Sequence, residues 1–241
     1  MIFKVVCKKE VLQSIIDALL PINDEVKLEI TSDSITTKVV DAANVIYSSI
    51  KVPSSAFDYY QADSGFMAVE LDKIGDLIGV GSKDAMVTLE LDDPNKRLNI
   101  VIDDMKYKIG LIDPSAIQKM RDLPQLTFAS KVTLDGGKFS SIVAAARKVT
   151  DDHVQVISND ESFAIAARGN IDTFVTAIPA TGLADASALY SIDYFVSLSK
   201  IISKAETFMI EFSQDYPMRI TLAVKGLSIE YLMAPRTEAV E

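Results

Sequence analysis

The sequence of 241 residues repeats its own pattern after about half of its length. Asp72 and Asp193 are 121 residues apart, and Tyr107 and Ile229 are 122 residues apart. With these offsets, the segment MAVELDKIGDLIG of the first half aligns with ALYSIDYFVSLSK of the second half. A repeat of this length predicts two similar domains in one chain.

Each half contains two segments with the period of an amphipathic helix, set among short segments that alternate like strands. The apolar stripes of the four helical segments are Leu12, Ile15, Ile16 and Leu19; Leu71, Ile74, Leu77 and Ile78; Phe139, Ile142, Val143 and Ala146; and Ile192, Phe195, Leu198 and Ile202. Alternating segments cover 2–7, 25–31, 34–40, 45–53, 85–91, 97–102 and 105–112, then 128–134, 153–158, 162–168 and 171–179, and three more end the chain. This order predicts an α+β fold in which two helices of each domain pack on antiparallel sheets.

Between the two halves, residues 111–128 follow neither the helical nor the strand period. Pro114 and Pro124 bracket this segment, which is polar but still contains Ile117, Met120 and Leu123. We therefore expect an extended surface connector with apolar side chains that a simple spacer does not need. The expected division is an N-terminal domain over residues 1–112, an interdomain connector over 113–127 and a C-terminal domain over 128–241.

Composition restricts the class of protein. Lys and Arg total 24 against 34 Asp and Glu, so the net charge is −10. This charge argues against a protein that coats nucleic acid with positive charge, but it is compatible with lysines gathered on one face. Cys7 is the only cysteine, which excludes an internal disulfide. No apolar run approaches the roughly 18 residues of a membrane span, and the amino terminus lacks the apolar core of a signal peptide, so we expect a soluble intracellular protein.

No set of residues has the spacing of a catalytic or metal site. His153, the only histidine, stands at the start of an alternating segment, and Cys7 lies in another. The Asp pairs at 92–93, 103–104 and 151–152 fall in expected turns, where solvated carboxylates are common. The segment Gly79–Lys83 lacks the spacing of a phosphate-binding loop. We expect no enzyme, no cofactor and no metal.

Four motifs in order resemble those of the sliding clamps of the PCNA type, closest to the archaeal members. They are VVDAANV (39–45), FDYYQAD (57–63), LIDPSAIQKMRDLP (111–124) and YLMAPR (231–236). No one motif is decisive, but their order and spacing together are specific, and the resemblance covers essentially the whole chain.

The resemblance implies a DNA clamp fold without catalytic activity. Members of this family close three two-domain subunits head to tail into a ring, with helices lining a central hole through which duplex DNA passes without sequence-specific contacts. DNA polymerase, ligase and nuclease dock through short peptide motifs, and a clamp loader opens the ring. The implied protein is a homotrimeric processivity factor for DNA replication and repair, cytoplasmic in an archaeon and nuclear in a eukaryote.

The resemblance also implies a peptide-docking pocket between the loop near residue 44, the connector and the terminal tail. By position in the motifs, its residues are Val40, Asn44, Val45, Met120, Leu123, Pro124, Pro217, Leu232, Ala234 and Pro235. The chain departs from the family at Asn44, where histidine is common, and at Tyr47, where an aliphatic residue is usual. The connector is also about two residues longer than expected, which leaves the peptide preference open.

If the helices line a hole, their polar faces meet DNA. Helical wheels place Glu10, Gln13, Ser14 and Asp17 opposite the apolar stripe of the first helix. By the same construction, four lysines and five carboxylates face the hole: Lys83, Lys148, Lys200 and Lys204, against Glu10, Asp17, Asp72, Asp76 and Asp193. We therefore expect weak contacts with phosphates that depend strongly on salt.

Ring closure in this family pairs edge strands of neighbouring subunits. The resemblance assigns residues 105–112 and residues 171–178 to this contact, because both alternate suitably and an unpaired edge promotes aggregation. The expected interface residues are Tyr107, Ile109, Leu111, Thr173 and Val175.

Two other interpretations remain open. The chain can be one subunit of a heterotrimeric clamp, including a checkpoint-type clamp, although its nearly intact connector and tail motifs favour the replicative form. More remotely, it can be a small-molecule enzyme on a duplicated α+β domain. A deep polar pocket with perturbed carboxylates favours that enzyme, whereas an apolar surface groove favours the clamp.

Overall fold

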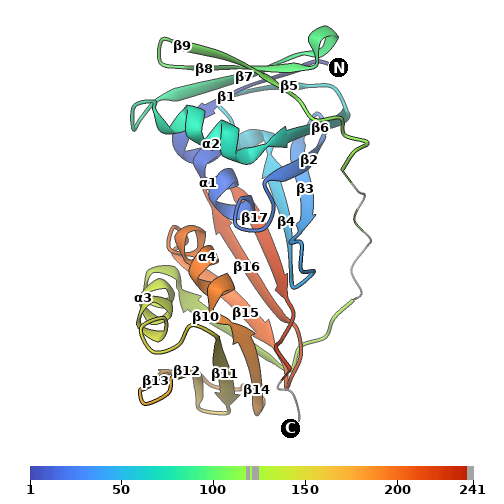
Figure 1. Ribbon diagram of the computed structural model, residues 1–241. Helices are drawn as coiled ribbons and strands as arrows, with labels where there is room; N and C mark the ends of the chain where they lie inside the picture. Colours follow the sequence, from blue (N-terminus) through green and yellow to red (C-terminus); the bar gives the residue numbers. More distant parts are fainter. Residues whose placement is uncertain (118–119, 121–124, 238–241) are drawn as a thin grey trace. The chain divides into compact units, whose positions relative to one another are not determined.

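A computed structural model describes residues 1–117, 120 and 125–237 of the chain (Figure 1). The chain divides into two compact units. The first unit comprises Met1–Ala42, Ser48–Arg121 and Ala223–Ile229, and the second comprises Ala43–Tyr47, Asp122–Leu222 and Glu230–Glu241. Among the described residues, no helix is long and apolar enough to cross a membrane.

The first unit contains two helices and two groups of strands. Its elements are β1 (Phe3–Lys8), α1 (Lys9–Leu19), β2 (Glu25–Ile30), β3 (Ser34–Val40), β4 (Ile46–Pro53), β5 (Tyr59–Ala62), β6 (Gly65–Glu70), α2 (Leu71–Gly79), β7 (Met86–Asp92), β8 (Arg97–Ile102) and β9 (Met105–Gly110). One sheet has the order β5-β1-β7-β8-β9, and the other strands follow the order β4-β3-β2-β6. Neighbouring strands such as β7 and β8 are antiparallel, with Leu89 opposite Ile100.

The second unit repeats this plan. Its elements are β10 (Ser130–Asp135), α3 (Gly136–Ala146), β11 (His153–Asn159), β12 (Ser162–Arg168), β13 (Thr173–Pro179), β14 (Ala186–Ser191), α4 (Ile192–Ile202), β15 (Thr207–Phe212), β16 (Met218–Val224) and β17 (Leu227–Met233), except that the end of β16 and the start of β17 are assigned to the first unit with Ala223–Ile229. Four strands form a sheet in the order β13-β12-β11-β14, and four others follow the order β10-β15-β16-β17. The predicted α+β class with helices on antiparallel sheets is therefore confirmed.

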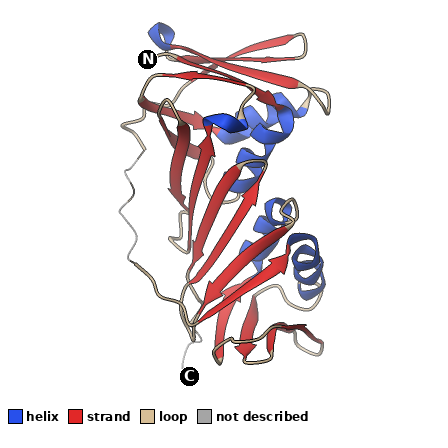
Figure 2. Ribbon diagram, turned by 180° about the vertical axis from the view of Figure 1, so that it is seen from behind, coloured by secondary structure: helices blue, strands red, loops and turns tan. Residues whose placement is uncertain are grey.

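The two helices of each unit lie side by side against its strands (Figure 2). Gly136 opens α3 at a position where a Cβ would overlap the carbonyl oxygens of Ile202 and Ala205, so only glycine permits this approach to the end of α4. Asp135 caps α3 by accepting a hydrogen bond from the backbone of Lys138 at 2.6 Å. The ring of Phe139 on α3 then packs edge to face against Phe195 of α4, with centroids 5.6 Å apart.

In each repeat, a residue shortly after the last strand forms a backbone hydrogen bond with the strand that precedes the second helix. We call each of these bonds a closing bridge. In the first unit, Ile112 donates its backbone N–H to the carbonyl of Ala68 in β6 at 3.1 Å. In the second unit, Arg236 donates its backbone N–H to the carbonyl of Leu189 in β14 at 2.7 Å. Ala68 and Leu189 are 121 residues apart, so the internal repeat extends to these two closing bridges.

The helical wheel was wrong for part of α1. It placed Ser14 and Asp17 on the exposed side, but their exposed fractions are only 1% and 5%. Val11 and Ala18 are buried with them, so α1 packs on a second side besides its apolar stripe. The Ser14 hydroxyl donates to the carbonyl of Glu10 at 2.7 Å, and Asp17 accepts from the Gln13 amide at 2.9 Å. These local bonds allow both polar side chains to be buried.

Candidate functional site

The predicted docking loop and the terminal tail meet within the second unit. The backbone N–H of Ala234 donates to the carbonyl of Val45 at 2.8 Å. Asn44 has a positive φ of 56°, in the left-handed region that asparagine tolerates better than most residues. The sequence therefore places a residue suited to this turn directly before the carbonyl that holds the tail.

Apolar side chains around this junction are neither buried nor fully exposed. Val45, Pro217, Leu232, Ala234 and Pro235 are half-buried, and Asn44 is exposed. Peptide-binding grooves are commonly lined by partly exposed apolar side chains on a fixed backbone.

A hydrogen bond from a buried tyrosine fixes the residue before Pro217. The side chain of Tyr190 is fully buried, and its hydroxyl donates to the carbonyl of Tyr216 at 2.7 Å. Burial, together with the charge of Asp215, raises the pKa of Tyr190, so the hydroxyl remains a neutral donor. The residue before Pro217 is thereby fixed to the sheet.

Two of the other predicted pocket residues are assigned to the first unit. Val40 and Met120 are half-buried residues of the first unit, and the Val40 carbonyl accepts a bond from the Asn23 amide at 3.3 Å. Leu123 and Pro124 lie outside the described residues. The assignment of these four residues to the pocket stays a prediction.

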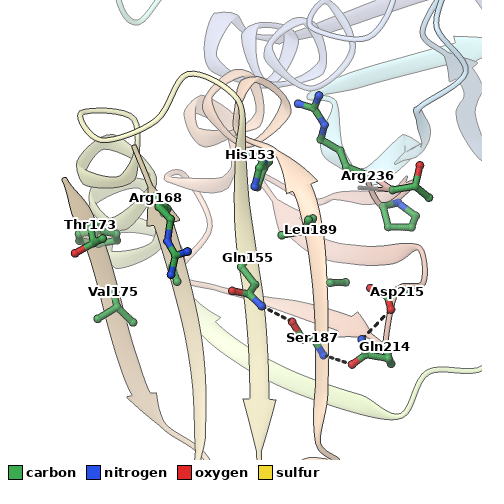
Figure 3. A pocket seen from close by; sticks show the side chains of 16 residues that line it. His153, Gln155, Arg168, Thr173, Val175, Ser187, Leu189, Gln214, Asp215 and Arg236 are labelled. Atoms are coloured by element: carbon green, nitrogen blue, oxygen red, sulfur yellow. Dashed lines mark hydrogen bonds between the residues drawn. The ribbon is translucent and has the colours of Figure 1, made fainter. Parts of the chain in front are cut away.

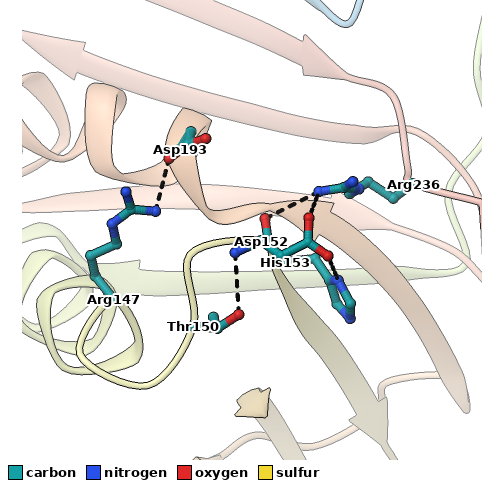
Figure 4. A network of polar contacts seen from close by, with 6 residues as sticks. All are labelled: Arg147, Thr150, Asp152, His153, Asp193 and Arg236. Atoms are coloured by element: carbon teal, nitrogen blue, oxygen red, sulfur yellow. Dashed lines mark hydrogen bonds and ion pairs between the residues drawn. The ribbon is translucent and has the colours of Figure 1, made fainter. Parts of the chain in front are cut away.

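The tail is anchored by a polar network that the sequence analysis did not predict (Figure 4). The guanidinium of Arg236 binds the carboxylate of Asp152 and donates to its carbonyl oxygen at 3.3 Å. Nδ1 of His153 lies 2.8 Å from the other carboxylate oxygen of Asp152. His153 is the first residue of β11, as predicted, but Asp152 is paired and is more than a solvated turn residue. The adjacent Asp-His pair and the arginine of YLMAPR were the available signals.

We expect Asp152→Asn to loosen the tail. The hydrogen bond from His153, followed by the charge of Arg236, holds the pKa of Asp152 below its usual value. Because the pKa of Asp152 is lower in the folded chain than in the unfolded chain, its ionised form stabilises the folded tail at neutral pH. This stabilisation is lost only as the pH falls below about 3.9. The neutral variant should therefore show at pH 7 about fivefold faster exchange of the Arg236 amide proton, corresponding to about 1 kcal/mol. Residue-resolved hydrogen exchange measures this rate.

Asp151→Asn is the matched control, because its neighbouring carboxylate bonds to Arg147 at 3.5 Å and not to the tail. It should leave the exchange of the Arg236 amide unchanged. Equal acceleration in both variants would show that Asp152 does not anchor the tail.

Beside the anchored tail, a hollow of about 800 Å³ opens over the four-stranded sheet of the second unit (Figure 3). We call it the sheet hollow. Strand residues and tail residues line it, including His153, Gln155, Arg168, Ser187, Pro235 and Arg236. The sequence analysis did not predict this hollow, because its lining comes from four strands and the tail, which only the folded chain brings together.

The four lysines predicted to face DNA are all exposed. Lys83 follows α2 in the first unit, and Lys148, Lys200 and Lys204 lie at or after the ends of α3 and α4 in the second unit. Their proposed contact with DNA stays a prediction.

The predicted excess of carboxylates on the helices is partly neutralised. Lys225, in the turn between β16 and β17, lies 3.0 Å from Glu10 of α1. Arg147, directly after α3, lies 2.8 Å from Asp193 of α4. With Asp17 buried, three of the five carboxylates named above do not present a free exposed charge.

The strands predicted to join subunits both lie at a sheet border. β9, which carries Tyr107 and Ile109, ends the order of the five-stranded sheet, and Leu111 follows it. β13, which carries Thr173 and Val175, ends the order of the four-stranded sheet. The side chain of Val175 is 69% exposed. Such an exposed apolar residue is unusual on an edge strand that no other chain covers.

Two of the residue classes that often carry catalysis, potential metal ligands and cysteine, can be located in the described residues. Within them, no three His, Cys, Asp or Glu side chains are grouped to hold a metal ion. Cys7 is fully buried, as expected for a small apolar residue, and burial raises the pKa of its thiol to about 12. A thiol with this pKa is a poor nucleophile at neutral pH.

Comparison with known proteins identifies the family. Residues 2–115 match the N-terminal domain of proliferating cell nuclear antigen. The chain is 37% identical to the DNA polymerase sliding clamp of Methanothrix thermoacetophila, covering 98% of both chains, and 34% identical to that of Methanosarcina barkeri, covering 98% of this chain and 99% of the relative. The solved structure of A. fulgidus PCNA bound to the C-terminal region of FEN-1 matches with a TM-score of 0.91 at 28% identity, covering 99% of this chain and 100% of that chain.

The two sequence matches and the structural match cover at least 98% of this chain, and the structural match agrees with the α+β architecture described above. The chain belongs to the family of PCNA-type DNA polymerase sliding clamps.

Proposed function

We propose that the chain is the subunit of a homotrimeric ring that encircles duplex DNA and tethers DNA polymerase. Membership of the sliding-clamp family supports this proposal, as do the two sheet-border strands β9 and β13. A head-to-tail contact between two different borders generates a closed ring when the rotation between subunits is one third of a turn. Retention on DNA then depends on ring closure, so an acidic protein can hold DNA without tight contacts.

Partner proteins are proposed to dock by short peptide motifs at the loop–tail junction. The observation that carries this proposal is the hydrogen bond from Ala234 to Val45, which fixes two backbone segments beneath partly exposed apolar side chains. The A. fulgidus relative binds the C-terminal region of FEN-1, which supports a peptide as the docked element. The proposed partners are polymerase, clamp loader, ligase and nuclease.

The proposed role includes no catalysis. The buried thiol of Cys7 and the structural use of His153 beside Asp152 and Arg236 support this view. The chain then acts as a mobile platform, and chemistry is performed by the proteins that it tethers. The expected contact between channel lysines and phosphates is weak and dependent on salt.

Light scattering across a dilution series tests the ring. A mass near three times 26.3 kDa that persists on dilution is the expected result for a self-closing homotrimer. A stable monomer would overturn the homotrimer and favour one subunit of a heterotrimeric clamp.

A further inference from the structure

The two repeats differ at the position that lies beside each closing bridge. In the first unit this position is Phe66, two residues before Ala68 in β6; in the second it is Ser187, 121 residues later. Phe66 lines a hollow of about 160 Å³ beside Ile112, whereas the sheet hollow beside Arg236 measures about 800 Å³. The larger hollow therefore lies in the unit that has serine at this position, and the smaller hollow lies in the unit that has phenylalanine.

Two arginines and the imidazole of His153 line the sheet hollow from three segments (Figure 3). Arg168 ends β12, and the pairing of Val154 with Ala167 places His153 of β11 directly opposite it on the same face. Arg236 joins them from the tail. The guanidinium of Arg236 is paired with Asp152, so Arg168 carries the positive charge available in this cluster.

Both carboxylates near the hollow, those of Asp152 and Asp215, accept hydrogen bonds from other residues of the chain. Asp152 bonds to both His153 and Arg236, and Asp215 accepts a bond from the Gln214 amide at 2.8 Å. By contrast, the guanidinium of Arg168 has no ion pair within the part of the chain that the structure describes. An incoming carboxylate would therefore find its partner in Arg168.

The neutral polar groups of the floor are bonded to one another. The Gln155 amide donates to the Ser187 hydroxyl at 2.8 Å, and the Ser187 backbone N–H donates to the Gln214 side chain at 2.8 Å. A neutral amide or hydroxyl entering the hollow would compete with these bonds, whereas an acidic group gains a charge-assisted bond to Arg168.

The hollow is continuous with the proposed docking surface, because Pro235 belongs to both and Arg236 follows it. A peptide that docks on the tail therefore brings its flanking residues to the edge of the hollow. We propose that the sheet hollow binds an acidic side chain from the segment that flanks the docked peptide motif, with Arg168 as the residue that selects it. This inference rests on the peptide docking proposed above and adds a preference for flanking sequence.

Fluorescence anisotropy with labelled peptides tests the proposal. The probe is the C-terminal region of FEN-1, extended in separate peptides by three Glu or three Gln residues at either end. For one end, the intact clamp should bind the Glu-extended peptide about fivefold more tightly than the Gln-extended peptide, as expected for one partly exposed ion pair. Arg168→Gln should remove this preference and leave the affinity for the Gln-extended peptide unchanged.

Arg97→Gln is the matched control, because Arg97 is an exposed strand arginine of the first unit and its loss changes the net charge equally. The Arg97→Gln variant should still bind the Glu-extended peptide more tightly than the Gln-extended peptide. Equal affinity for both extensions at both ends, or the same loss in both variants, would overturn the acidic pocket. Failure of every peptide to bind would instead overturn the docking function and the pocket with it. A change of trimer mass in Arg168→Gln with the preference intact would assign the hollow to the subunit contact.

Discussion

The Val175→Asp variant is expected to elute and scatter light as a single subunit of 26.3 kDa under conditions where the unchanged protein is a trimer. Val175 lies on the border strand β13 with its apolar side chain 69% exposed. In the proposed ring this side chain is covered by strand β9 of the neighbour, so a carboxylate there would be desolvated without a partner. Such a change costs about 2 kcal/mol at each of three equivalent contacts. Light scattering across the dilution series measures the result.

Val80→Asp provides the comparison, because Val80 is similarly exposed at 65% but lies in the turn after α2. It should leave the trimer intact, and both variants should retain their circular dichroism and melting temperature. If Val175→Asp forms a trimer as stable as the unchanged protein, the assignment of β13 to the ring contact is wrong.

Leu232→Ser is expected to weaken binding of the FEN-1 C-terminal region at least about thirtyfold while the trimer persists. Leu232 is a half-buried residue of β17, two residues before the Ala234 bond to Val45. An apolar anchor at the centre of a small docking site contributes about 2 kcal/mol or more when it is fully covered by the partner. Titration of labelled peptide with anisotropy detection gives the dissociation constants.

Leu20→Ser is a suitable control, since Leu20 is an exposed leucine at the end of α1 in the first unit. It should bind the peptide as the unchanged protein does. Equal affinities for all three proteins would remove Leu232 from the docking site. A loss of affinity accompanied by unfolding of Leu232→Ser would be recognised by its lowered melting temperature and would require the milder Leu232→Val.

The helices were predictable because their apolar residues recur with the helical period. The stripe residues Phe139, Phe195 and Ile202 are buried where the 3.6-residue period places them. The strands β6 and β14 were missed because no run of adjacent charges or glycines spans the junction at which each runs into its helix. By contrast, β1 and β10 also run directly into helices, but they end at Lys8-Lys9-Glu10 and Asp135-Gly136-Gly137. A short apolar strand joined to an amphipathic helix gives one continuous apolar pattern, in which the change of period is hidden.

The candidate site was less predictable because its geometry depends on long-range bonds. The motif YLMAPR indicated the tail, but only the folded chain brings Arg236 to Asp152 and Leu189. Likewise, Ser14 and Asp17 look exposed on a wheel, yet their hydrogen bonds within α1 allow burial. Pairings between residues far apart in sequence leave no local pattern from which to infer them.

The two closing bridges have a consequence for protein engineering. Ile112 closes the first repeat before the chain continues into the connector, and Arg236 holds the equivalent position in the second repeat. In the first repeat the chain continues covalently into the connector directly after the closing bridge. The equivalent position in the second repeat should therefore also accept a covalent extension. A cargo domain fused after Thr237 would depart from its unit along a route that the fold already accommodates, so subunits could be joined or decorated there without disturbing either sheet.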